Sequence, residues 1–216
     1  MTQAEEVRQL WIKEPRAFVK AFWPHIVLYP KQEQILESVR DNVETYVPAG
    51  NMLGKDFISG LTALWYFTVF DVVRVVTTSV KDDHLRVLWG EIGTFLDTAV
   101  VPLREEQGGP FKVNHNDIRK VAGSAESRSK SYLRGMVSKT GEGMAGHHAP
   151  KTLLIVDEAS GVDDSVHDQG MTWAKRLLVI GNPNPCTNFF FRGVTAGDLL
   201  NEDTDAETPP QIQADE

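Results

Sequence analysis

Short apolar runs of strand length alternate with longer helical patterns along most of the chain. Residues 72–79, 152–156 and 176–182 are nearly continuous apolar runs, which is typical of strands buried on both faces. Because helical segments separate these runs, the sequence predicts an α/β fold with a mainly parallel sheet flanked by helices on both faces. In such sheets, ligands bind beyond the carboxyl ends of the strands.

The same periodicity predicts the remaining elements. Residues 3–22 are expected to form one helix, polar at its start and apolar at its end. Further helices are predicted at 32–42, 54–70 and 82–100, and short strands at 44–50, 111–115 and 131–138. The longest apolar run, LTALWYFTVF at 61–70, is far shorter than the ~20 residues of a membrane span. We therefore expect a buried helix there and no membrane partner.

Composition indicates an ordinary globular protein with one sizeable core. The chain has 216 residues, of which 41% are hydrophobic and 24% charged. A single cysteine, Cys186, excludes an intramolecular disulfide and a cysteine zinc cluster. The N-terminal residues lack the apolar stretch of a signal peptide. Of the formal net charge of −8, seven charges come from residues 198–216, so the charge balance neither favours nor excludes a nucleic-acid partner.

Residues 47–59, VPAGNMLGKDFIS, are similar to a phosphate-binding loop, whose pattern is G-x-x-x-x-G-K-[ST]. Aligned on Lys55, the segment has Ala49 in place of the first glycine and Asp56 in place of the hydroxyl residue. It lies between a predicted strand and a predicted helix. There, backbone N–H groups would face an anion and Lys55 would reach the β- and γ-phosphates of a nucleotide. The alternative is an ordinary turn that starts a helix.

An acidic pair follows a later apolar run in TLLIVDEAS, residues 152–160. Asp157 is suited to hold Mg²⁺, and Glu158 to act as a base or to orient an attacking water. The alternative is a solvated acidic turn. A glycine–lysine loop after an early strand and an acidic pair after a later one together favour an ATPase over coincidence.

Two amide side chains complete the candidate site. Asn182 follows the run 177–181 and would lie beside the end of the strand that carries Asp157, where an amide can sense the γ-phosphate. A simple Asn-Pro turn is the alternative. Gln32 precedes a predicted helix, and its amide can pair with the donor and acceptor edge of adenine. A solvated glutamine at a helix start is the alternative.

These four features, in this order, resemble the ATPase domain of the large terminase subunits of tailed bacteriophages, the motors that package DNA into procapsids. The resemblance covers roughly residues 25–195 and is most specific in GHHAPKTLLIVDEASGVDD, at 146–164. RVVTTSVKDDHLRVLWGEI and LLVIGNPNPCTNFFFRGV are also similar to family segments. The resemblance implies a P-loop NTPase fold and a Mg²⁺-dependent ATP hydrolase that translocates double-stranded DNA.

The resemblance also implies residue roles and partners. Gln32 matches the adenine-recognition glutamine, Asp157 and Glu158 the Walker B pair, and Asn182 the coupling position. The Walker A loop, which would bind ATP, is matched by Ala49, Gly50, Asn51, Met52, Leu53, Gly54, Lys55 and Asp56. The implied partners are double-stranded DNA, a small terminase subunit, the portal protein and further copies of this chain in a ring. The implied location is the bacterial cytoplasm, transiently at the procapsid portal of a phage or prophage.

The sequence departs from the family pattern at three positions, of which Ala49, in place of the leading glycine, is a mild change if its φ is negative. Asp56 replaces the Ser or Thr that ligates Mg²⁺; a carboxylate is also a hard oxygen ligand, but it adds negative charge to the site. Asn51 occupies the place where the family often carries an arginine. A neighbouring subunit would then supply the arginine, and the basic segment 126–139 offers Arg128 in preference to Arg134. The alternative is that this segment is a solvated loop or contacts DNA phosphates.

Three parts are expected along the chain: a helical segment at 1–24, the ATPase domain at 25–197, and an acidic linker or cut end at 198–216. The nuclease domain that follows in the family is absent, so no nuclease activity is expected. Two alternative functions remain. One is a nucleotide-binding assembly module in which Asp56 impairs hydrolysis; the other is a helicase-like DNA remodeller, disfavoured because it needs two such lobes.

Other conspicuous side chains are interpreted as structural. The pair His147–His148 suggests a metal site, but no third ligand has suitable spacing, so packing or hydrogen bonding in a loop is preferred. Core packing is likewise preferred over base stacking for Trp11, Trp23, Trp65, Trp89 and Trp173.

Overall fold

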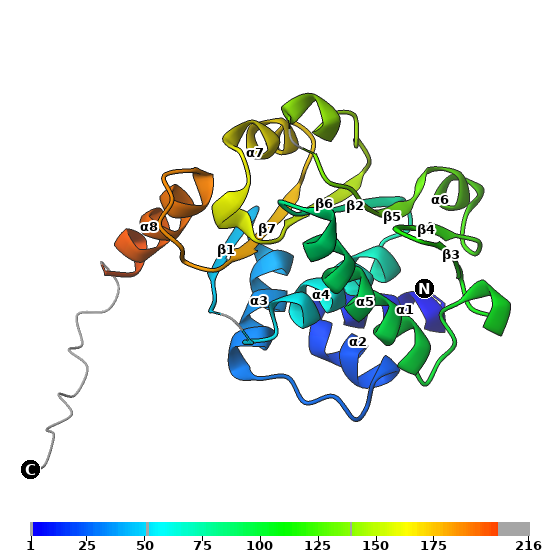
Figure 1. The fold of residues 1–216 in the computed structure, drawn as a ribbon. Helices are drawn as coiled ribbons and strands as arrows, with labels where there is room; N and C mark the ends of the chain where they lie inside the picture. The colour runs from blue at the N-terminus through cyan, green and yellow to red at the C-terminus, as the bar shows by residue number, and fades with distance from the viewer. Residues whose placement is uncertain (1, 51, 139, 203–216) are drawn as a thin grey trace, which may run out of the picture.

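A sheet of seven strands in the order β1-β7-β6-β2-β5-β4-β3 forms the centre of the molecule (Figure 1). The computed structural model describes residues 2–50, 52–138 and 140–202, with side chains up to residue 196. In this part of the chain β1, β7, β6, β2 and β5 run parallel, while β4 is antiparallel to both of its neighbours, β5 and β3. The strands are β1 Glu44–Pro48, β2 Val73–Thr78, β3 Phe111–Asn114, β4 Asp117–Lys120, β5 Tyr132–Gly135, β6 Lys151–Val156 and β7 Arg176–Gly181.

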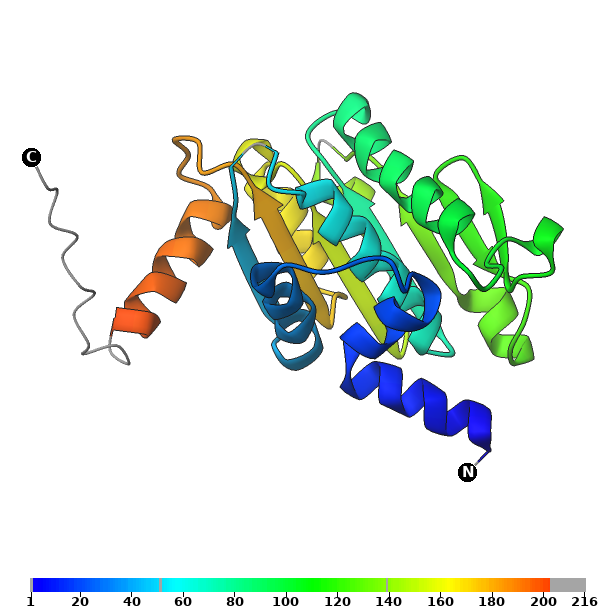
Figure 2. The same cartoon turned by 90° about the horizontal axis from the view of Figure 1, so that it is seen from below.

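Helices cover both faces of the sheet, as predicted, and α1 to α5 lie together on one side of it (Figures 1 and 2). The α-helices are α1 Gln3–Lys13, α2 Pro15–Phe22, α3 Pro30–Asp41, α4 Lys55–Val69, α5 Asp82–Thr98, α6 Ala125–Lys130, α7 Asp164–Met171 and α8 Phe189–Glu202. The described residues also form the 3₁₀ turns η1 Glu105–Gln107, η2 Gly141–Met144 and η3 Ala159–Gly161.

Alternate side chains of the central strands enter two separate cores. On β6, Leu153 and Ile155 pack in the larger core with α2 to α5, whereas Leu154 and Val156 pack in a smaller core with α7 and the start of α8. Because both faces of the strand are buried here, the four residues Leu153 to Val156 are all apolar. The apolar run at 61–70 lies in α4, whose residues Leu61, Leu64 and Phe67 are fully buried, as expected for a core helix.

The N-terminal segment forms two helices, so the prediction of one helix over residues 3–22 is wrong. The break falls at Glu14, whose φ of −128° and ψ of 84° lie outside the helical region. Pro15 causes it, because proline lacks an N–H and disfavours a helical conformation in the residue before it. Beyond the break, Phe18 and Phe22 of α2 pack in the larger core.

No element was predicted from the sequence at the positions of β4, α6, α7 and α8. Strand β4 forms a hairpin with β3, and its sequence DIRK has only one apolar residue, Ile118, which is buried. Helix α6 is capped by the Ser124 hydroxyl, which accepts a hydrogen bond from Ser127 N at 3.0 Å. The basic segment 126–139, for which a solvated loop was one interpretation, contains most of α6 and all of β5, where Tyr132 and Leu133 are buried.

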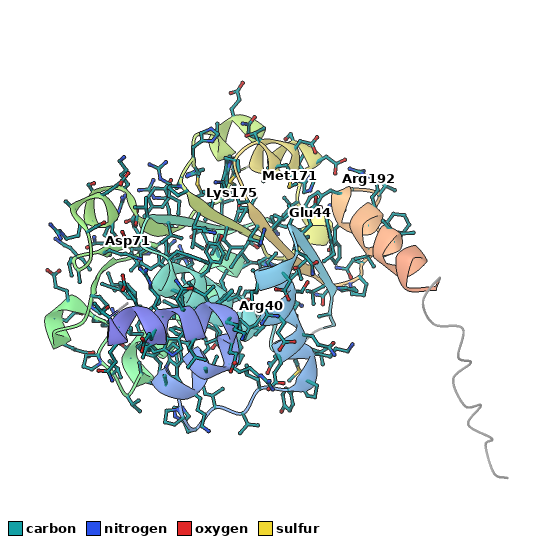
Figure 3. All side chains as sticks on the ribbon, turned by 180° about the vertical axis from the view of Figure 1, so that it is seen from behind. Arg40, Glu44, Asp71, Met171, Lys175 and Arg192 are labelled. Atoms are coloured by element: carbon teal, nitrogen blue, oxygen red, sulfur yellow. The ribbon has the colours of Figure 1, made fainter. Side chains whose placement is uncertain are left out.

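Helix α8 lies along β1 at one edge of the sheet (Figure 2). From behind, Glu44 on β1 and Arg192 on α8 lie close together, while Asp71, just before β2, lies on the other side of the molecule (Figure 3). The helix extends to Glu202, five residues into the segment 198–216, and residues 203–216 lie outside the described residues. Among the described residues, none of the helices has the length and apolar character needed to cross a membrane.

Candidate nucleotide-binding site

The candidate phosphate-binding loop connects β1 to α4 at the carboxyl edge of the parallel strands. Its last residue, Gly54, has a φ of +76°, a conformation that glycine adopts without steric cost. Met52 also has a positive φ, 63°, and is fully exposed, whereas Asn51 lies outside the described residues. Helix α4 starts at Lys55. A helix start presents N–H groups and the positive end of the helix dipole, which together favour an anion.

Lys55 joins three elements at this edge. Its Nζ donates to Asn182 Oδ1 at 2.9 Å and to Gly50 O at 3.5 Å, and it lies 3.6 Å from Glu158 Oε1. The side chain is only 7% exposed. Asn182 follows β7, and β7 lies between β1 and β6 in the sheet. The sequence prediction that Asn182 lies beside the end of the strand carrying Asp157 is therefore correct.

Asp157 is a buried carboxylate without a full set of partners. It is 1% exposed, its Oδ2 accepts from Ser79 Oγ at 3.5 Å, and its Oδ1 has no hydrogen-bond partner among the described residues. Burial, together with the charges of Asp56 and Glu158, raises the pKa of Asp157 to about 7. A buried carboxylate oxygen in this state fits a position that receives a cation.

Asp56 contributes a second carboxyl to the same electrostatic environment. It is half-buried in the first turn of α4, and burial raises its pKa although the neighbouring charge of Lys55 lowers it. The described residues contain no group of three or more His, Cys, Asp or Glu side chains placed to hold a metal ion. Asp56 and Asp157 are two hard oxygen donors, and a Mg²⁺ ion held by them would take its remaining ligands from phosphate oxygens and water.

Glu158 is held in an uncommon backbone conformation. Its φ of 49° and ψ of 43° lie in the left-handed region, which few residues other than glycine adopt. The turn that follows packs tightly on the end of β7, because a Cβ added to Gly181 would lie 2.7 Å from Ala159 N. Strained residues at a site require support from the surrounding structure, and this close contact provides it.

Gln32 lies against the loop, at the start of α3. Its Oε1 accepts from Tyr29 N at 3.1 Å, which caps the helix, and a Cβ on Gly54 would lie only 3.2 Å from its Nε2. A cavity of about 750 Å³ extends from here to Lys55, a size typical of ligand sites. Ala49, Leu53 and Ile180 supply apolar lining. Adenine recognition by Gln32 stays a prediction, although the cavity is large enough and reaches the loop.

A second hollow of about 810 Å³ lies on the other side of Pro48, between the loop after β7 and α8. Its lining has no charged side chain and includes Pro183, Pro185, Phe190 and Phe191. It therefore lacks the groups that would bind phosphate, and the cavity beside Lys55 is the better candidate for a nucleotide.

Two candidate residues lie away from this edge. Arg128 is in α6, which leads into the amino end of β5, and its Nη1 donates to Gly123 O at 2.5 Å. It cannot act on a nucleotide bound beside Lys55 of its own chain, because that loop lies at the carboxyl end of the parallel strands. His147 packs in the smaller core, as preferred from the sequence: Nδ1 lies 2.5 Å from the Tyr132 hydroxyl, and the ring lies 4.9 Å from that of Trp173.

Ser79 is a site residue that the sequence analysis missed. It follows β2, is 1% exposed, and its hydroxyl donates to Asp157. The rule that ligands bind beyond the carboxyl ends of parallel strands identifies this position, because Ser79 is the last residue of the apolar run 72–79. The interaction orients Asp157 from the neighbouring strand.

Comparisons with known proteins identify the fold. No protein-family model and no curated protein sequence matches the chain. The large terminase of bacteriophage HK97 superimposes with a TM-score of 0.58 at 12% identity, covering 94% of this chain and 42% of that one. The ATPase domain of a Thermus phage large terminase has a TM-score of 0.56 at 14% identity, covering 81% and 71%.

A third structure, the large terminase of a thermophilic bacteriophage in complex with ADP, has a TM-score of 0.54 at 16% identity. The superposition covers 43% of that terminase and 81% of this chain. The chain thus spans less than half of this terminase and of the HK97 protein. The strand order, the loop before α4 and these superpositions lead to one conclusion: the chain has the fold of the ATPase domain of phage large terminases.

Proposed function

We propose that this chain binds ATP with Mg²⁺ beside Lys55 and hydrolyses it. The observation that carries the proposal is the convergence of Lys55, Asn182 and Glu158 from three different elements, next to the buried Asp157. Phosphoryl transfer needs a cation for the phosphates, a carboxylate to orient or deprotonate water, and an acid to hold a metal. At this edge of the sheet, Lys55, Glu158 and Asp157 are the candidates for these parts.

Each side chain has a distinct role in this proposal. Lys55 neutralises the β- and γ-phosphates, and Glu158 accepts the proton of the attacking water. Asn182, which accepts a hydrogen bond from Lys55, senses whether the γ-phosphate is present. Asp157 and Asp56 hold Mg²⁺, which when bound neutralises charge on the phosphate oxygens.

We further propose that hydrolysis drives the translocation of double-stranded DNA. The shared fold with phage large terminases supports this, and one of those structures contains ADP. In this proposal, copies of the chain form a ring, act with a small terminase subunit and a portal protein, and work at the procapsid in the bacterial cytoplasm.

A second function, a nucleotide-dependent assembly module, is favoured by Asp56. Its carboxyl is desolvated and shares the site with Asp157 and Glu158. Three carboxyl groups around a triphosphate would oppose turnover by repulsion while Lys55 still binds the nucleotide. This alternative predicts ATP binding without phosphate release.

Two variants test the proposal. Glu158→Gln keeps ATP binding and loses hydrolysis, because an amide cannot accept the proton of water. Lys55→Ala weakens ATP binding by roughly tenfold to a hundredfold, the value of one hydrogen bond to a charged group. Calorimetric titration with ATP and single-turnover hydrolysis separate the two effects, with the exposed Lys20→Ala as the control. Wild-type hydrolysis in Glu158→Gln would contradict the role of Glu158.

A further inference from the structure

Three arginines surround one tyrosine on the sheet face opposite α4 and α5. The guanidinium carbons of Arg74, Arg119 and Arg134 lie 5.1, 5.0 and 4.8 Å from the centre of the Tyr132 ring. The strand register explains this arrangement. Tyr132 on β5 pairs with Arg74 on β2 and with Arg119 on β4, and Arg134 follows two positions along β5 on the same face.

Lys112 extends this row of cations to the edge of the sheet. It pairs with Arg119 across β3 and β4, so it lies on the same face, and it is exposed. We call these residues, Lys112, Arg74, Arg119 and Arg134, the arginine patch. Neighbouring strands are about 4.8 Å apart, so the cations repeat across the sheet at a spacing that a chain of anions can follow.

The arginine patch carries more positive than negative charge. Asp117 is its carboxylate partner: it lies 2.5 Å from Arg119 Nε and 2.7 Å from Arg134 Nη2. Arg74 instead donates to two backbone carbonyls, Lys130 O at 3.3 Å and Gly146 O at 3.2 Å. Among the described residues, Asp117 is the one carboxylate that forms a salt bridge with the arginine patch, and it pairs with two of its four cations.

The arginine patch is held rigidly but remains open to an anion. Tyr132 is 7% exposed and its hydroxyl is fixed by His147, which packs against Trp173. Arg119 and Arg134 nevertheless keep 36% and 37% of their side chains exposed. A guanidinium that lies on an aromatic ring keeps outward N–H groups for bidentate bonds to phosphate.

We propose that the arginine patch binds the phosphate backbone of double-stranded DNA. The proposal deepens the DNA-translocating function proposed above and rests on it for the choice of partner. An acidic protein is the competing partner. DNA is favoured because planar guanidinium groups match phosphate oxygens, and because contacts across β3, β4, β5 and β2 follow an extended, regularly charged ligand.

The test is the salt dependence of DNA binding by the full chain. Fluorescence anisotropy with a labelled duplex of about 30 base pairs gives the slope of log K against log [salt], to which each phosphate contact contributes about 0.9. Lys112→Gln and Arg119→Gln each reduce the slope by about 1. The matched control is Arg86→Gln on α5, which removes the same charge from the opposite face; Arg86 is 64% exposed.

The outcomes separate the arginine patch from the proposed hydrolysis. Arg119→Lys keeps the charge and should restore the wild-type slope. Thermal unfolding verifies that each variant is folded, and ATP hydrolysis without DNA is measured in parallel. Equal slopes in wild type, Lys112→Gln and Arg119→Gln overturn the patch whether or not ATP is hydrolysed. So does an equal loss in Arg86→Gln, or displacement of DNA by polyglutamate at equal charge concentration. A reduced slope in a chain that does not hydrolyse ATP supports the patch and contradicts only the ATPase.

Discussion

Asp56 is the residue that most distinguishes this site from the usual phosphate-binding loop. It stands where a hydroxyl is expected, and it adds to the charges that raise the pKa of Asp157. Without a cation, the two carboxyl groups and Glu158 repel one another, although Lys55 Nζ lies 3.6 Å from Glu158 Oε1. A divalent cation would relieve this repulsion, so the carboxyl group and the metal requirement should be linked.

We therefore expect Asp56→Ala to raise the Mg²⁺ concentration needed for half-maximal ATP hydrolysis. Asp56→Ser should restore a hydroxyl ligand and keep or increase turnover. Hydrolysis is measured over a Mg²⁺ titration at fixed ATP, and nucleotide binding at each Mg²⁺ concentration separates binding from turnover. An unchanged Mg²⁺ dependence in Asp56→Ala would show that the carboxyl group acts elsewhere, for example on the helix dipole.

His147 should make the stability of the protein depend on pH. Burial, with the charges of Arg134 and Arg74, lowers its pKa to about 4, below its value of about 6.5 in an unfolded chain. The unfolded state therefore binds the proton more tightly. The contribution of His147 is complete above about pH 6.5 and is lost as the pH falls towards 4, by up to about 3 kcal/mol.

Urea unfolding of wild type and His147→Gln at several pH values between about 7 and 4 measures this effect. We expect the wild type to lose more free energy of unfolding over this range, because glutamine cannot be protonated. Parallel curves for the two proteins would mean that His147 is protonated equally well in the folded and unfolded states.

At the scale of elements, the strands that position the site were predictable and the elements at the margins were not. Strands β6 and β7 are buried on both faces, so their continuous apolar runs identify them and place Asp157, Glu158 and Asn182 at one edge. Strand β4 has one apolar residue, Ile118, because its other buried residue is Lys120, and α6 is short and polar, so neither has a clear hydrophobic period. The contact of Ser79 with Asp157 depends on strand order, which the sequence does not contain.

The junction between the ends of β6 and β7 is tightly packed. A Cβ at Gly181 would lie 2.7 Å from Ala159 N, a backbone atom that cannot rotate away. Gly181→Ala should therefore lower the free energy of unfolding by about 1–3 kcal/mol and reduce hydrolysis, because the turn that holds Glu158 must shift.

Gly90→Ala on α5 is the control for this prediction. A Cβ there would meet nothing within 4 Å, so alanine should stabilise the helix by about 1 kcal/mol or less. Chemical denaturation of both variants measures the difference. Equal stability of Gly181→Ala and wild type would show that the two strand ends are not packed as described.

At the scale of the whole molecule, Arg128, the candidate arginine for the transition state, does not lie beside the nucleotide site of its own chain. An arginine of this kind contributes roughly 10³–10⁵ in rate in related enzymes. Arg128 lies on α6, at the amino ends of the parallel strands, so it could serve only the site of another copy. In the ring proposed above, one subunit would complete the site of its neighbour.

Mixing two inactive variants tests this idea. Arg128→Ala subunits retain Glu158, and Glu158→Gln subunits retain Arg128, so mixed assemblies should regain part of the hydrolysis that each variant lacks. ATP hydrolysis is measured against the mixing ratio, with wild type mixed with Glu158→Gln as the control. Full hydrolysis by a monomeric wild-type chain, or no recovery in the mixture, would exclude an arginine supplied by a neighbour.

The most direct test of the central claim, an ATPase coupled to DNA, is steady-state phosphate release by the full chain. It is measured with Mg²⁺ and ATP, with and without duplex DNA, and with Glu158→Gln as the background. We predict slow release without DNA, because the site depends on a partner copy, and faster release when DNA brings copies together. Bound ATP with no release above the Glu158→Gln background, with or without DNA, would contradict the claim and favour the assembly module.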